Sequence, residues 1–177
     1  MRYWQIALLL LTLVPQYITC QDHASKNQTF GEENLGSMEA VRIPNSVVDA
    51  LIASKEADAG RSWARNNPGK DLNLPFKAFP VSLSGSREKD YVVWGQPPLS
   101  GADNDWFWVV QTTSPKPRVV LFCGALTLEM VHQVHNSLRD IRCAWESPGG
   151  DGFIQDYRFN GQRYVLSKKT ETHRRRP

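Results

Sequence analysis

The stretch SGADNDW holds the residues most suggestive of a metal site, because Asp103 and Asp105 stand at alternating positions. Alternating carboxylates are typical of calcium loops, but such a loop needs about six oxygen ligands and usually a bidentate Glu. No Glu follows Asp105 at the proper distance. We therefore expect no bound metal and no cofactor. The polar loop from Leu99 to Asp105 is instead expected to be exposed and to contact a ligand.

Two histidines in the stretch HQVH, His132 and His135, could hold one metal ion if the segment were helical, because residues three apart share a helix face. On a strand the two rings would point to opposite faces. Zinc would also need further ligands, and Glu129 is the only near one. We interpret both histidines as structural residues.

Cys123 and Cys143 are the two cysteines outside the first twenty residues. Each stands in an apolar run whose alternation turns it inward, Cys123 with Leu121 and Cys143 with Ile141. In an exported domain such a pair predicts a disulfide, which removes the thiol that a Cys-His hydrolase would need. The sequence also lacks a Gly-x-Ser-x-Gly elbow and a phosphate-binding loop, so we expect no catalytic residues.

The Asn-Gly pair at 160–161 predicts a β-hairpin with a two-residue turn, because both turn positions require positive φ angles. That turn would place Arg158 directly opposite Arg163, which is unfavourable unless a carboxylate or a bound anion lies between them. Asp156 or Glu146 could supply the carboxylate. The alternatives are an anionic ligand and two solvated arginines that diverge on an exposed face.

Apolar alternation and turn residues predict that the chain is mainly β from Phe76 onward. We expect an antiparallel sandwich or half-barrel of about six to eight short strands. The segment 126–134 fits either a strand or a single helical turn. The other expected strands cover residues 76–83, 90–96, 106–111, 118–124, 140–146, 154–159 and 162–168.

The run WFWVVQ is apolar on both faces of its predicted strand, with Trp106 and Trp108 on one side and Phe107 and Val109 on the other. We expect other elements to cover both faces, since large aromatic residues dominate β cores. The alternative is an exposed platform of Trp106 and Trp108 that stacks on a sugar ring or a partner.

The segment IPNSVVDALIASKEADAG predicts one N-terminal helix, with Asn45 or Ser46 as its cap and Gly60 as its end. Residues 21–40 lack apolar periodicity and are expected to form a flexible spacer. We thus expect a single β-rich domain over 41–169 and a basic disordered tail over 170–177.

Residues 1–20 have the composition of a signal peptide: a basic start, the apolar run IALLLLTLV, and polar residues after Cys20. The run is too short to span a bilayer. The mature chain is therefore expected to be exported, to the periplasm or the extracellular space, without a transmembrane span. The alternative to cleavage after Cys20 is its lipidation, which would anchor the chain to a membrane.

The net charge of +3 comes from 21 Lys and Arg against 18 Asp and Glu. Without Arg2 and the three arginines at 174–176, 17 basic residues remain, one fewer than the acidic ones. A nucleic-acid binder concentrates basic residues on its folded surface. We therefore expect no nucleic-acid partner.

Several segments between residues 76 and 166 occur in a characteristic order: KDYVVWGQPPLSGADNDWFWVVQ, VVLFCGA, LRDIRCAWES and YRFNGQRYV. This order resembles a loose group of exported bacterial β-rich proteins that have no assigned activity. The resemblance implies a β architecture and no particular ligand. Members of the group carry an acidic loop similar to integrin-type calcium loops. In the corresponding LSGSREKD only one aspartate, Asp90, remains, so a metal role is not carried over.

Together these features predict an exported, non-enzymatic protein that binds an unknown protein or cell-envelope ligand. The alternative is a small cell-wall hydrolase, which would depend on Asp103, Asp105 or His135, or an inhibitor of a lysozyme-type hydrolase. The candidate ligand-binding residues are polar residues of the loop and of two C-terminal strands: Asp103, Asp105, Arg142, Arg158 and Arg163.

Overall fold

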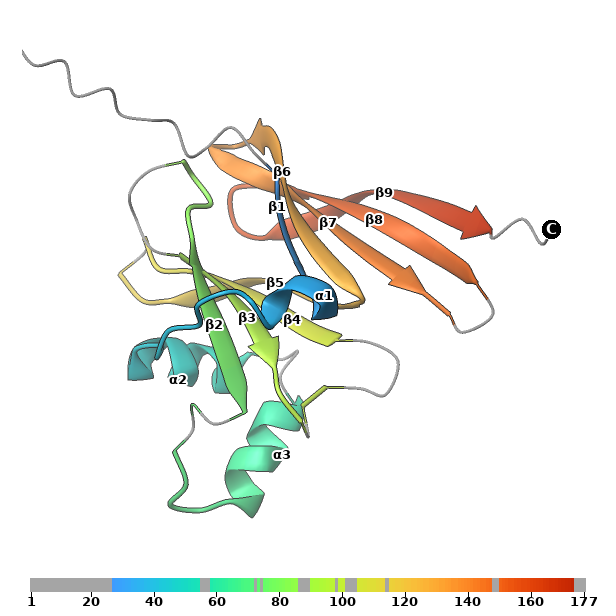
Figure 1. Cartoon of the computed structure of the whole chain (residues 1–177). Helices are drawn as coiled ribbons and strands as arrows, with labels where there is room; N and C mark the ends of the chain where they lie inside the picture. The colour runs from blue at the N-terminus through green and yellow to red at the C-terminus, as the bar shows by residue number, and fades with distance from the viewer. Residues whose placement is uncertain are drawn as a thin grey trace, which may run out of the picture.

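The computed structural model describes residues 27–54, 58–71, 73, 75–85, 90–97, 99–100, 105–113, 115–147 and 150–173. Within these residues the chain is mainly β, with nine strands in two antiparallel sheets and three short helices between β1 and β2 (Figure 1). The helices are α1 (Glu32–Leu35), α2 (Asn45–Ala53) and α3 (Asp58–Asn66). The strands are β1 (Gln28–Gly31), β2 (Phe76–Val81), β3 (Asp90–Gly95), β4 (Asp105–Gln111), β5 (Arg118–Ala125), β6 (Thr127–His135), β7 (Leu138–Glu146), β8 (Asp151–Phe159) and β9 (Tyr164–His173).

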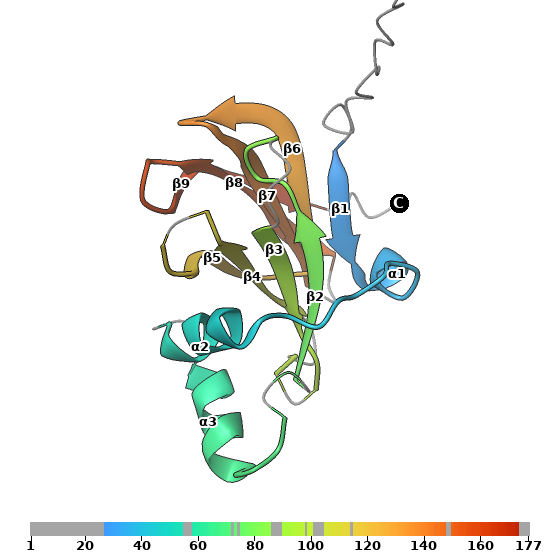
Figure 2. The ribbon, with the colours of Figure 1, turned by 90° about the vertical axis from the view of Figure 1, so that its left-hand side faces the viewer.

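The two sheets pack as a sandwich, which is one of the two expected architectures. The four-stranded sheet has the order β2-β3-β4-β5, and the five-stranded sheet has the order β1-β6-β7-β8-β9. Figure 2 shows α2 and α3 on the side of the four-stranded sheet that is away from β6 to β9. The molecule therefore has three layers, helix, sheet and sheet, and no described element covers the outer face of the five-stranded sheet.

Strand β4 is buried on both faces, as the sequence predicts. Phe107 and Val109 belong to the core between the two sheets. Trp108 packs on the opposite face, in the cluster that includes Val47 and Leu51 of α2. Because Trp108 is fully buried, it cannot form an exposed stacking platform.

The single helix expected around residues 43–60 is two helices in the structure. Helix α2 buries the predicted apolar face but ends at Ala53, and Gly60 lies inside α3 instead of ending a helix. Glycine costs about 1 kcal/mol in a helix, an amount that tertiary contacts can offset. Here the Arg61 guanidinium donates hydrogen bonds to the carbonyl oxygens of Ile52 and Ser54, at 3.3 and 2.5 Å, which ties α3 to the end of α2.

Part of the expected spacer, residues 28–35, belongs to the fold. Strand β1 pairs with β6 in antiparallel register, with Phe30 opposite Leu128, and Phe30 and Leu35 are buried in the core between the sheets. Two apolar residues are too few to show a period, and their partner strand lies about a hundred residues later, so the sequence gives no local signal. Likewise residues 170–173, expected in the tail, pair with β8 as the end of β9.

The β8–β9 hairpin has a four-residue connection instead of the predicted two-residue turn. Arg158 pairs with Val165, so the predicted pairing of Arg158 with Arg163 is wrong. The Asn160 side-chain oxygen accepts hydrogen bonds from the backbone N–H groups of the two residues after Gly161, at 2.9 Å each. Such Asx bonds stabilise a longer turn, in which Gly161 alone has a positive φ, 98°.

Candidate functional site

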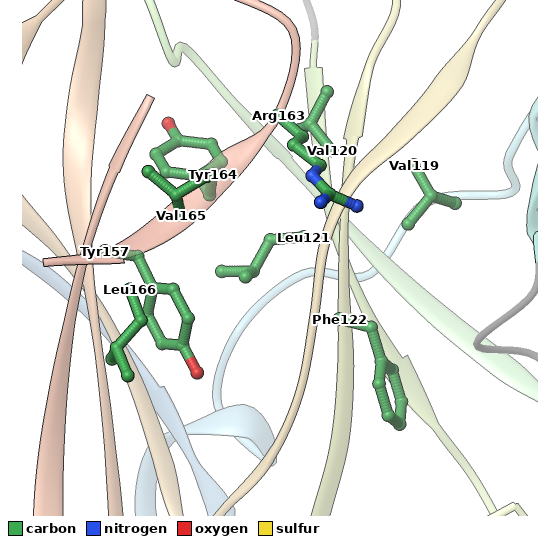
Figure 3. Close-up of a pocket in the computed structure, with 9 residues that line it drawn as sticks. All are labelled: Val119, Val120, Leu121, Phe122, Tyr157, Arg163, Tyr164, Val165 and Leu166. Carbon is green, nitrogen blue, oxygen red and sulfur yellow. The ribbon is translucent and has the colours of Figure 1, made fainter. Parts of the chain in front are cut away.

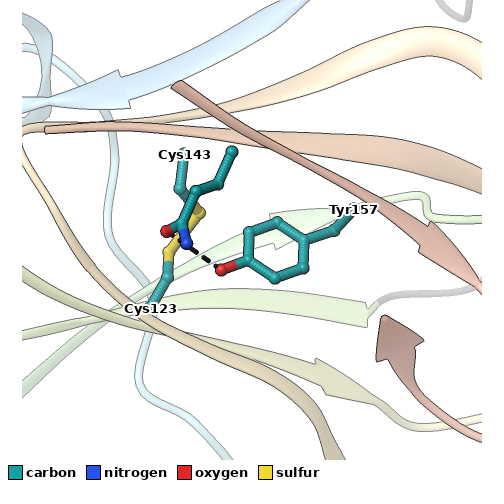
Figure 4. Close-up of a disulfide and its surroundings, with 4 residues drawn as sticks. Cys123, Cys143 and Tyr157 are labelled. Carbon is teal, nitrogen blue, oxygen red and sulfur yellow. Dashed lines mark hydrogen bonds between the residues drawn. A yellow bond between two sulfur atoms is a disulfide. The ribbon is translucent and has the colours of Figure 1, made fainter. Parts of the chain in front are cut away.

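The predicted disulfide is present: Cys123 of β5 is bonded to Cys143 of β7, and both residues are buried (Figure 4). Neither sulfur is therefore available as a nucleophile. Tyr157 lies beside the bond in Figure 4 and donates a hydrogen bond from its hydroxyl to the Gln155 side-chain oxygen at 3.2 Å. Burial raises the pKa of Tyr157, so its hydroxyl stays protonated at neutral pH.

A polar groove of about 240 Å³ on the outer face of the five-stranded sheet contains two of the predicted arginines. Arg142 enters it from β7 and Arg158 from β8, while Lys168 adds a third cation from β9. The groove therefore joins three neighbouring strands. Its lining residues are Val131, Gln133, Asp140, Arg142, Asp156, Arg158, Ser167 and Lys168.

One row of alternating charges crosses the sheet through this groove. Arg142 stands opposite Glu129 of β6 and Asp156 of β8, and Lys168 stands opposite Asp156 on β9. The Arg142 Nε donates to Asp156 Oδ1 at 2.8 Å, and its Nη1 donates to Glu129 Oε2 at 3.4 Å. The hydrogen bond to Asp156 is the main reason that the pKa of Arg142 is raised. Arg142 is thus a fixed, permanently charged group.

A second set of charged groups surrounds Asp140. One carboxylate oxygen of Asp140 lies 2.7 Å from His135 Nδ1, and the other lies 3.8 Å from Arg158 Nε. Asp140 is buried, so this carboxylate orients both side chains from below the surface. Together with the first set, it places a less exposed carboxylate beside each groove arginine.

The cations of the groove are more exposed than the acids. The exposed side-chain fractions are 41% for Arg142 and 53% for Arg158, but 9% for Asp140 and 27% for Asp156. Lys168 is also exposed. A ligand that approaches from solvent therefore meets the guanidinium and ammonium groups first.

The remaining predicted binding residues do not join this groove. Arg163 lies in the β8–β9 connection and lines a different cavity, between β5 and β9. Asp105 begins β4 in the other sheet, opposite Ala125. Asp103 lies outside the described residues. The five predicted residues are therefore not one site.

Asp105 has a perturbed carboxyl group. Partial burial raises the pKa of Asp105, the nearby Trp94 indole favours the ionised form and offsets part of this rise, and the Glu32 carboxylate adds to it. The alternative hydrolase would depend on Asp103, Asp105 or His135, so the relative position of Asp105 and His135 bears on it. Asp105 pairs with Ala125, just before β6 begins, whereas His135 is the last residue of β6. The structure does not bring the two together.

The structure places the histidines and the aspartate that the sequence analysis considered as metal ligands. His132 and His135 lie on a strand, not on a helix, and no group of three or more His, Cys, Asp or Glu residues that could hold a metal occurs among the described residues. Asp90 belongs to the segment that corresponds to the acidic loop of the resembling proteins, and its side chain is fully buried. Its carboxylate accepts hydrogen bonds from the backbone N–H groups of Thr112, at 2.8 Å, and Leu83, at 3.4 Å.

Sequence reasoning did not place Asp140, Asp156 or Lys168 among the site residues. The alternation of β7 does predict that Asp140 and Arg142 share a face, and both line the groove. The sequence does not give the register of β8 against β7 or of β9 against β8. This register determines that Asp156 lies opposite Arg142 and that Lys168 lies opposite Asp156.

No protein-family model, curated protein or solved structure matches this chain. None of the helices in the described ranges is long and apolar enough to cross a membrane.

Proposed function

We propose that the protein is an exported, non-enzymatic binding protein that takes an anionic ligand in the groove formed by Arg142, Arg158 and Lys168. The observation that carries this proposal is the difference in exposure of the charges: the cations of three neighbouring strands are more exposed than the carboxylates beside them. Guanidinium groups that are already held in place lose little freedom when they bind a carboxylate or phosphate.

The proposed compartment rests on two features. Residues 1–20 have the composition of a signal peptide, and a buried disulfide is typical of proteins in oxidising compartments. We expect the anionic group to belong to a cell-envelope component in that compartment.

A binding role is favoured over catalysis by the positions of the reactive groups. Cys123 and Cys143, the two cysteines outside residues 1–20, are bonded to each other. Asp105 and His135 lie at different places in the fold, and the His135 ring is engaged by Asp140.

Titration calorimetry with polyphosphate and polygalacturonate as probes, at low and high salt, tests the proposal. We expect R158Q and K168Q each to weaken binding about tenfold, the effect of losing one charge-assisted hydrogen bond. The matched control is K169Q, because Lys169 is the next residue on β9 and its ammonium lies 4.3 Å from the Phe153 ring, on the other face. Equal binding by all three variants, or turnover of peptidoglycan by the purified protein, would contradict the proposal.

A further inference from the structure

A second cavity, of about 340 Å³, lies between β5 and β9 (Figure 3). Figure 3 shows Leu121 extending from β5 toward Tyr157 and Leu166 on the other side of the cleft. The walls are mostly apolar, and among the described lining residues only Arg163 is charged. The lining residues are Val119, Val120, Leu121, Phe122, Tyr157, Arg163, Tyr164, Val165 and Leu166.

The cleft is bounded by the edges of two strands. Residues 119–122 of β5 line it consecutively, and so do Arg163, at the end of the β8–β9 connection, and residues 164–166 at the start of β9. Because alternate residues of a strand point to opposite faces, a consecutive run means that the backbone edge itself borders the cavity. Both β5 and β9 are outermost strands of their sheets. Within the described residues, neither outer edge pairs with another strand.

Where they border the cleft, strands β5 and β9 carry no charged residue, although the register of β5 shifts at Val120 and that of β9 shifts at Ser167. Natural edge strands are commonly guarded by charged residues, prolines or bulges. Strand β9 has Lys168 and Lys169 in its exposed second half, but residues 164–167 are uncharged. Strand β5 is uncharged from residue 119 to its end at Ala125. The uncharged parts of both strands are those that border the cleft.

We infer that the cleft between β5 and β9 binds an extended peptide segment of a partner protein by strand addition. A peptide backbone supplies N–H and C=O groups along its whole length, which the free strand edges can pair with. Val165 and Leu166, 37% and 49% exposed, offer apolar contacts to the peptide side chains.

Arg163 indicates the charge of that peptide. Its guanidinium lies beside the β5 ribbon in Figure 3, and it forms no ion pair among the described residues. An acidic side chain or a C-terminal carboxylate of the peptide would neutralise it. The expected partner segment therefore has alternating apolar residues next to one acidic group.

A random heptapeptide library displayed on phage, selected on the wild-type protein with L166K as counter-selection, tests this inference. We expect enrichment of alternating apolar peptides that contain an acidic residue. One enriched peptide, made synthetically, should bind L166K at least about tenfold more weakly than the wild type. T170K is the matched control, because Thr170 is an exposed residue of the same strand outside the cleft. R163Q should keep binding but lose the preference for the acidic residue.

The mode of binding is tested with a twin of the enriched peptide, which has the same sequence but is N-methylated at alternate backbone amides to remove their hydrogen-bond donors. We expect the twin to lose binding, and the unmodified peptide to slow hydrogen exchange at amides within 119–122 or 163–166. Failure to enrich any peptide, equal binding by L166K, or equal binding by the twin would overturn the inference. So would a dimer that protects the same amides, because a second copy would then be the occupant. R158Q and K168Q should leave peptide binding unchanged, which separates this test from that of the anion groove.

Discussion

Cys123 and Cys143 link an edge strand of one sheet to the central strand of the other, since β5 ends the four-stranded order and β7 lies in the middle of the five-stranded order. In the described chain no strand pairing connects the two sheets. The disulfide therefore ties together two layers that otherwise meet through side-chain packing and a 2.8 Å hydrogen bond from the Arg139 backbone N–H to the Leu83 carbonyl oxygen.

Replacement of both Cys123 and Cys143 by Ala should lower the free energy of unfolding by about 3 kcal/mol, because the bond closes a loop with a sequence separation of 20. Urea unfolding measures this loss. Reductant should produce the same loss in the wild type and none in the double variant. An unchanged unfolding midpoint after reduction would show that the bond does not stabilise the fold.

Leu51→Ala should destabilise the protein by about 3 kcal/mol, because Leu51 is fully buried between α2 and the four-stranded sheet. Asp49→Ala on the exposed side of the same helix should change stability by less than about 0.5 kcal/mol. Thermal unfolding of the two variants and of the wild type measures both changes in stability. Similar effects of the two changes would mean that α2 does not cover the sheet as described.

Much of the fold is predictable from local patterns in the sequence. The two apolar faces of β4 and the inward alternation of Cys143 on β7 are confirmed, because each depends on a single strand. Strand β1 and helix α3 are not predictable in this way, because contacts with distant parts of the chain determine whether they form. Phe30 is held in the core because its strand pairs with β6. Helix α3 contains Gly60, a residue type that usually marks the end of a helix.

The candidate site is less predictable than the fold, because it depends on register between strands. Arg142 and Arg158, two of the ligand-binding residues expected from the sequence, line one groove. The carboxylate beside Arg142 follows from which β7 residue faces which β8 residue. At the β8–β9 turn, the Asn160 side chain lengthens the connection and removes Arg163 from the position opposite Arg158. A dipeptide turn signal does not report such a side-chain bond.

Tyr164→Phe should cost about 1 to 2 kcal/mol of stability, because the Tyr164 hydroxyl donates a 2.6 Å hydrogen bond to the buried carbonyl oxygen of Arg139. Burial also raises the pKa of Tyr164, so the hydroxyl remains a donor at neutral pH. Tyr157→Phe should cost less, since Tyr157 is only half-buried. Urea unfolding of the two variants gives the comparison, and a larger loss for Tyr157→Phe would contradict it.

Asp105→Asn should raise the free energy of unfolding at neutral pH. The folded state raises the pKa of Asp105 above its usual 3.8, so it favours the protonated form. The resulting penalty appears as pH rises from about 3.8 through the raised pKa and is complete above it. Urea unfolding from pH 3 to pH 7 should therefore show the variant gaining stability over the wild type only as pH increases. A difference that is constant with pH would contradict this assignment.

The most direct test of the anion groove is an NMR titration of the mature chain with polyphosphate at low salt. We predict amide shifts clustered around Arg142, Arg158 and Lys168, with a common affinity that falls steeply as salt is added. Shifts confined to the arginine run at 174–176, or scattered evenly over the surface, would contradict a specific anion site on the five-stranded sheet.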